Sequence, residues 1–178
     1  MAAFTMITNT EVGASGINRI EFDPIAGTYD HLYITASLRT NTTGAHQWDD
    51  VHLQFNDDTA STSSYTDIEC SSVSPVGGAQ ASGLRVGRAT NADADADFFN
   101  PLEIWIPNYA GTDGTKPVIA KSTVVGDASS VTYWRMHVTS GVWRSTAAIT
   151  AVDLHLASGT DLFVQYSIAT LYGVTGAV

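Results

Sequence analysis

Long charged side chains are scarce in this 178-residue chain, and lysine is the scarcest of them. Charged residues make up 15% of the sequence, against about 25% in an average soluble domain. Lysine occurs only at Lys116 and Lys121. Helix surfaces are usually covered by Glu, Lys, Arg and Gln, whereas the Ser, Thr, Asn and Gly that carry the polar share here suit strands and turns. The shortage therefore predicts an all-β protein.

Positive charge is also too scattered to bind a nucleic-acid backbone. The formal net charge is −10, and the closest pair of arginines is Arg85 and Arg88. Binding to phosphates requires clustered Lys and Arg that displace counterions. We therefore expect no nucleic-acid partner.

The single cysteine, Cys70, excludes an intramolecular disulfide framework and a Cys-based zinc cage. No run approaches the ~18 consecutive apolar residues of a membrane span. Residues 1–12 lack the basic and long apolar regions of a secretory signal. We expect no membrane partner and no cofactor.

Alternation of apolar and polar residues at every second position is the dominant pattern. In residues 29–39, Leu32, Ile34, Ala36 and Leu38 share one face, as in a half-buried strand. Similar runs predict further strands at 4–8, 17–22, 51–55, 64–70, 84–88, 102–106, 117–125, 131–138, 149–156 and 162–172, with one possible helical turn at 143–148.

Roughly eight to eleven strands separated by turn residues predict two packed antiparallel sheets. The predicted fold is an all-β, two-sheet antiparallel β-sandwich that is jelly-roll-like, because this topology hides sheet edges. The alternation pattern does not give the strand order. We expect one domain at residues 17–178, preceded by an N-terminal arm or edge strand at 1–16. The longest irregular region is expected at 57–96.

Alternating aspartates at 93, 95 and 97 form the most conspicuous local motif. Asp93, Asp95 and Asp97 would lie on one side of an extended segment, and oxygen ligands at this spacing suit calcium. An EF-hand loop starting at Asp93 would need Gly and Glu where Phe98 and Ile104 stand. The simpler interpretation is a solvated acidic loop, and no metal site is assigned.

Nucleophilic catalysis has little support in the sequence. No Gly-x-Ser-x-Gly elbow occurs, and Cys70 has no neighbouring base. A two-carboxylate glycosidase site drawn from the scarce glutamates (Glu11, Glu21, Glu69 and Glu103) stays open. Strand alternation places His31, His52 and His137 on outward faces, and all five histidines are expected at surfaces or interfaces. They are His31, His46, His52, His137 and His155. We expect no enzymatic activity, and a polysaccharide-degrading enzyme is the least supported function.

Aromatic side chains on polar strand faces are the more informative feature. Exposed aromatics can stack on sugars or anchor a protein interface, while others fill the core. The candidates are Trp48, Trp105, Trp134, Trp143, Tyr33, Tyr109 and Tyr133.

Several segments, taken in order, resemble a family of small bacteriophage virion proteins and tail-fibre domains. The landmarks are 20–25 (IEFDPI), 28–29, 32–39, 55–56, 64–65, 104–109 (IWIPNY), 143–149 (WRSTAAI) and 165–173 (QYSIATLYG). The resemblance covers about residues 17–174, and IPNY together with ATLYG is its most specific part. It implies a non-enzymatic β-sandwich on the particle exterior and transfers no site residues.

The expected function is therefore that of a virion structural protein, made in the host cytoplasm and carried on the particle surface. Residues 1–16 leave little room for a fibre shaft, which favours a capsid decoration (cement) protein that contacts the major capsid protein or other virion proteins. The small number of charged residues and the apolar residues on both faces of 118–125 leave apolar surface that one subunit cannot bury alone. We therefore expect a homo-oligomer, a trimer. The alternative is a tail-fibre or receptor-binding module that recognises a host surface glycan.

Overall fold

The computed structural model describes residues 3–44, 46–60, 63–69, 72–80, 83–126 and 134–176, with 72–80 described through their backbone only. Within these residues the secondary structure is entirely β, and no helix is long and apolar enough to cross a membrane. The strands are β1 (Ala3–Glu11), β2 (Arg19–Phe22), β3 (His31–Leu38), β4 (Trp48–Phe55), β5 (Ser63–Glu69), β6 (Ser72–Gln80), β7 (Leu84–Thr90), β8 (Asn100–Pro107), β9 (Lys116–Val124), β10 (Arg135–Trp143), β11 (Val152–Leu156) and β12 (Ile168–Thr175).

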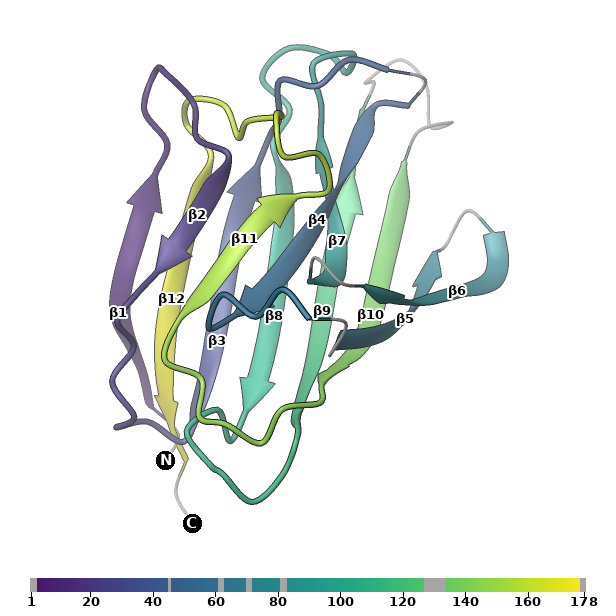
Figure 1. The fold of residues 1–178 in the computed structure, drawn as a ribbon. Helices are drawn as coiled ribbons and strands as arrows, with labels where there is room; N and C mark the ends of the chain where they lie inside the picture. Colours follow the sequence, from purple (N-terminus) through teal and green to yellow (C-terminus); the bar gives the residue numbers. More distant parts are fainter. Residues whose placement is uncertain are drawn as a thin grey trace.

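The strands form two antiparallel sheets, with the smaller sheet in front of the larger in Figure 1. The eight-stranded sheet has the order β1-β12-β3-β8-β9-β10-β5-β6, and the four-stranded sheet has the order β2-β11-β4-β7. The pairs β1·β12, β2·β11, β3·β8 and β4·β7 are nested in the sequence and alternate between the sheets, as in a rolled-up hairpin. This is a jelly roll with β5–β6 and β9–β10 inserted, and it confirms the predicted β-sandwich.

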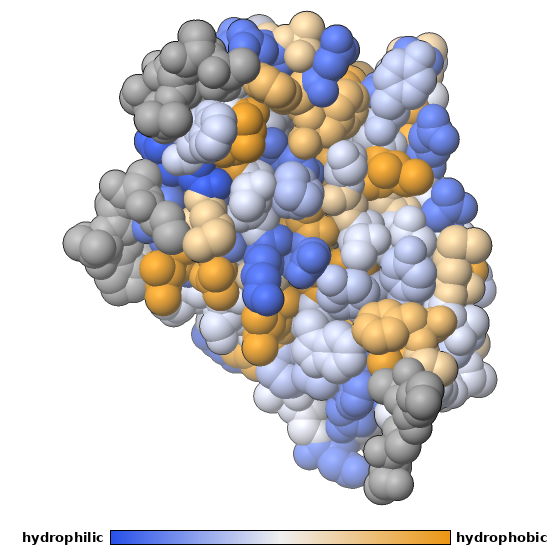
Figure 2. Space-filling model, turned by 180° about the vertical axis from the view of Figure 1, so that it is seen from behind, coloured by the Kyte–Doolittle hydropathy of each residue, from blue (hydrophilic) through white to orange (hydrophobic). Residues whose placement is uncertain are grey.

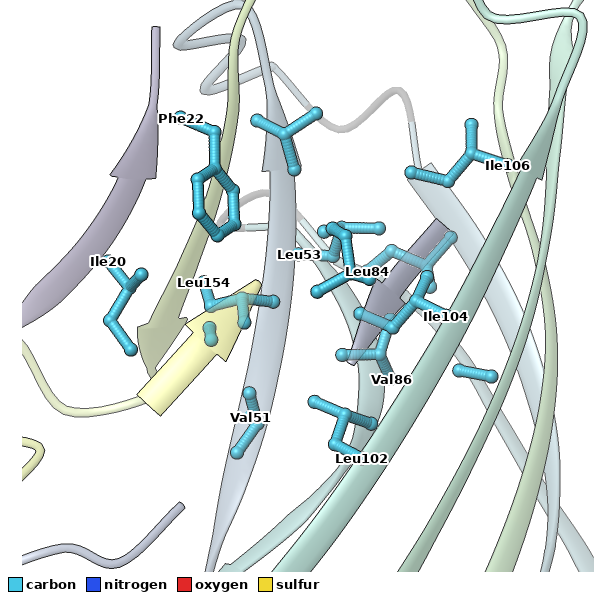
Figure 3. Close-up of a cluster of buried hydrophobic side chains, with 14 of the residues drawn as sticks. Ile20, Phe22, Val51, Leu53, Leu84, Val86, Leu102, Ile104, Ile106 and Leu154 are labelled. Carbon is cyan, nitrogen blue, oxygen red and sulfur yellow. The ribbon is translucent and has the colours of Figure 1, made fainter. Parts of the chain in front are cut away.

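The core lies between the sheets and is filled by the predicted inward positions (Figure 3). Leu32, Ile34 and Leu38 of β3 are each 0% exposed. The strands around them contribute equally buried side chains, among them Ile20, Leu53, Leu84, Ile104 and Leu154. Burial on this scale is the main stabilising contribution to a sandwich of this size.

The largest departure from the predicted pattern lies in β10. The structure buries His137, which is 1% exposed, and turns Met136 and Val138 outward. The alternation is real, but its polar face points inward because charged residues of β5 and β7 meet it there.

Three smaller expectations differ as well. Residues 57–96 are not a long irregular region, since they contain β5, β6 and β7. Residues 143–148 form no helical turn, and the last strand begins at Ile168 rather than 162. Cys70 and Tyr133 lie outside the described residues.

The landmark residues of the resemblance form packing contacts around the β2–β3 connection. Tyr109 is 0% exposed, and its hydroxyl donates to the carbonyl oxygen of Ala26. Gly173 lies so close to Tyr29 that a Cβ there would overlap the ring. These two landmark residues therefore stabilise the fold at this connection.

The two ends of the described chain lie side by side. The N-terminal segment forms β1, an edge strand of the eight-stranded sheet, in which Ala3 pairs with Thr175 of β12. Figure 1 shows both termini at the same end of the sandwich.

Candidate functional site

The outer face of the eight-stranded sheet carries most of the large exposed apolar side chains. Figure 2 views the molecule from this side and shows hydrophobic residues interspersed with polar ones. The exposed side chains on or beside its strands are Phe4, Met6, Ile68, Ile119, Trp134, Met136 and Val138. Monomeric proteins seldom expose this many large apolar side chains on one face, and such patches usually mark an interaction site.

One group, here called the aliphatic patch, consists of Ile68, Ile119, Met136 and Val138. They are between 39% and 60% exposed. Val138 pairs directly with Ile68 across β10 and β5, and Ile119 of β9 lies diagonally across from Val138. The patch therefore spans three adjacent strands.

A second group, here called the aromatic row, consists of Tyr172, Tyr33 and Trp105. These residues pair in register across β12, β3 and β8. Successive ring centroids are 6.4 Å and 6.3 Å apart. Phe4 contacts both tyrosines from β1, and His31 lies 5.0 Å from Trp105 at the other end.

The aromatic row and the aliphatic patch meet where Trp105 pairs with Ile119 across β8 and β9. Glu103 and Lys121 lie one i, i+2 step further along these strands, on the same face. They pair in register across β8 and β9 and line both hollows of this face. One hollow, of about 140 Å³, lies over Tyr33, Trp105 and Ile119. The other, of about 210 Å³, borders Met136 and Val138. Burial together with the nearby Glu103 carboxylate raises the pKa of Tyr33.

Of the aromatics singled out in the sequence, Trp105 and Tyr33 lie on this face, and Trp134 precedes β10 with 48% exposure. Trp143 and Tyr109 are core residues. Sequence alternation does not single out Phe4 or Tyr172 as exposed aromatics. The i, i+2 spacing of Phe4 and Met6 is the one pattern that places Phe4 on a shared strand face.

A buried ionic network fastens the two sheets together at the β5–β10 end. Arg88 of β7 binds Asp50 at 3.0 Å and Glu69 at 3.1 Å, and Arg85 binds Asp50 and Asp67. Burial alone would raise the pKa of Asp50, but the two arginines outweigh it and lower that pKa.

The same network contains His137 and Trp48. His137 Nδ1 lies 3.7 Å from Asp67, and burial followed by the charge of Arg88 lowers the pKa of this histidine. The guanidinium groups of Arg88 and Arg135 lie 4.9 Å and 5.3 Å from the centroid of Trp48. Each of these arginines lies beside carboxylates, and the network joins β4 and β7 of the smaller sheet to β5 and β10 of the larger one.

A smaller polar cluster lies on the outer face of the four-stranded sheet. His155 Nδ1 is 2.7 Å from Asp153, which also binds Arg19 at 3.4 Å. The ring of His52 lies edge-on to His155 at 5.6 Å. His52 is only 4% exposed, so the expectation that every histidine lies at a surface is wrong for it and for His137.

The three aspartates of residues 93–97 lie in a turn rather than an extended segment. Asp93 accepts a hydrogen bond from the Gly44 amide, and Asp97 adopts a left-handed φ of 67°. Among the described residues no group of three His, Cys, Asp or Glu side chains is arranged to hold a metal.

Comparison with known proteins gives no family assignment. No family model matches the chain, and no curated protein matches it significantly. Among solved structures, a functionally unknown protein from Saccharomyces cerevisiae aligns with a TM-score of 0.26 and 8% identity over 99% of this chain and 97% of its own. The exoplasmic/lumenal domain of VIP36 in its Ca2+/Man-bound form gives 0.27 and 9% over 92% and 89%. A protein of unknown function from Shewanella oneidensis MR-1 gives 0.25 and 11% over 98% and 77%. Likenesses at this level carry no argument about function.

Proposed function

We propose that the chain is a non-enzymatic structural protein of a bacteriophage particle, a capsid decoration protein carried on the particle exterior. The observation that carries the proposal is the aliphatic patch on the outer face of the eight-stranded sheet. The resemblance of the landmark segments to small phage virion proteins supports it.

The patch suits contact between protein subunits. The net charge of −10 makes two copies repel each other at most surfaces. Beside the patch, however, Glu103 and Lys121 have opposite charges, so the local charges cancel and apolar contact is less opposed. Burying the patch against a second copy removes it from water, and closed symmetry keeps the assembly finite. We expect a homo-oligomer, a trimer at local three-fold axes of the shell, that also contacts the major capsid protein.

Copy number per particle tests the location. Quantitative mass spectrometry of purified virions should find the chain in numbers comparable with the capsid subunits. A few copies per particle would instead place it in the tail and overturn the decoration function.

Sedimentation of the purified protein at micromolar concentration tests the oligomer. Ile68→Asp should shift the protein towards the monomer, because Ile68 pairs with the apolar Val138 and the new carboxylate would be buried at the interface without a partner. Ser158→Asp adds the same charge in an exposed turn after β11 and is the matched control. A wild-type monomer that also fails to bind capsids would refute the proposal.

A further inference from the structure

The aromatic row continues the same face beyond the aliphatic patch but has a different chemistry. Its rings are partly exposed, and each lies on a neighbouring strand of the sheet. Successive rings are tilted by 41° and 56°, which makes a stepped surface across the strands rather than a single flat plate. The hollow of about 140 Å³ lies over Tyr33 and Trp105.

A row of polar side chains runs beside these rings. Thr170 pairs with Thr35, which pairs with Glu103, which in turn pairs with Lys121. The row is one i, i+2 step along each strand from Tyr172, Tyr33 and Trp105, so it lies on the same face of the sheet. The surface thus combines aromatic rings with hydroxyl, carboxylate and ammonium groups along one edge.

We propose that the aromatic row is a binding site for a neutral oligosaccharide of pyranose rings. A pyranose presents flat C–H faces, which pack on aromatic rings, and hydroxyl groups around its edge, which need hydrogen-bond partners. Trp105 and Tyr33 supply the stacking surface, Glu103 accepts from hydroxyls, and Lys121 donates to ring or hydroxyl oxygens.

The charge of the site selects the ligand class. Glu103 and Lys121 are the charged residues that line the hollow, and their charges cancel. An acidic polysaccharide would need a surplus of positive charge, which the described residues lining these two hollows do not supply.

The aromatic row is also less suited than the aliphatic patch to form an interface with a second copy of the chain. A subunit interface is best served by the strongly exposed side chains of the aliphatic patch, whereas the rings of the row have intermediate exposure and contact one another. The saccharide site goes beyond the decoration function and does not depend on the position of the chain in the particle.

An array of neutral hexopyranose and N-acetylhexosamine oligosaccharides, probed with the full chain, tests the proposal. The strongest array ligand is then titrated by calorimetry. Trp105→Ala and Tyr33→Leu should each weaken binding at least about tenfold, and Glu103→Gln should weaken it a fewfold, because stacking and hydrogen bonding both contribute. Two aromatic variants keep the test valid if one of them fails to fold, which thermal unfolding would reveal.

Trp134→Ala is the matched control. It removes an equally large exposed ring that lies outside the row, so the affinity should not change. Absence of any array ligand, or equal loss in Trp134→Ala and Trp105→Ala, would overturn the site. A shift of Trp105→Ala towards the monomer in sedimentation, without an array ligand for the wild type, would assign the row to a subunit interface instead.

Discussion

His52 gives the most quantitative prediction, because its ring is buried without a compensating charge at hydrogen-bond distance. Burial, and then the neighbouring His155, lower the pKa of His52 from 6.5 to about 4. Its Nδ1 atom is buried and has no hydrogen-bond partner within the structure. The imidazole is therefore neutral in the folded protein over most of the acidic range.

The direction of the pH effect follows from the two states. The unfolded chain binds a proton at this histidine below about pH 6.5, whereas the folded protein binds it only below about pH 4. Unfolding takes up a proton within this window, so the free energy of unfolding falls as the pH is lowered through it. Each pH unit of separation corresponds to about 1.4 kcal/mol, so the loss attributable to His52 is about 3 kcal/mol.

Urea unfolding of the wild type and of His52→Gln, at about pH 7.5 and about pH 4, isolates this contribution. The wild type should lose about 3 kcal/mol more than the variant, since the remaining acid-sensitive groups are common to both. His46→Gln changes an exposed histidine and should lose as much stability as the wild type. Equal acid sensitivity in the wild type and His52→Gln would refute the reasoning.

Three further substitutions test the fold, each by urea unfolding at neutral pH. Leu154→Ala empties a site that is 0% exposed and should cost about 2–5 kcal/mol; a cost below about 1 kcal/mol would contradict its place in the core. Gly173→Ala forces a Cβ against the ring of Tyr29 and should cost about 1–3 kcal/mol, with partial recovery when Tyr29→Ala is added. Asp67→Asn removes one of the two carboxylates bound to Arg85 and should cost about 3 kcal/mol, whereas wild-type stability would show that Asp50 alone compensates this arginine.

The alternation pattern predicts the all-β class and the inward face of most strands. It succeeds at Leu32, Ile34 and Leu38, because one face of β3 meets the core and the other meets solvent. It fails in β10, where His137 packs against charged residues from β5 and β7. A periodicity rule ranks residues by polarity and carries no information about partners from distant strands.

The candidate site is harder to predict from the sequence than the fold class. Trp105 and Tyr33 stand out as aromatics on polar faces, but their pairing depends on β3 and β8 being neighbours, with 61 residues between the strands. That adjacency follows from the nested strand order, which local patterns do not encode. Tyr172 belongs to the row for the same reason, and Phe4 contacts it from the opposite end of the chain.

The pairing of Ala3 with Thr175 brings the two ends of the described chain close enough to be joined by a linker or extended from one place on the molecule. A short linker between the two ends would allow new ends to be opened in an exposed turn, such as the one at Ser158, and such circular permutants should fold to the same sandwich. Peptides fused to the two ends would leave the sandwich side by side, so two fused peptides could be carried without covering the outer face of either sheet.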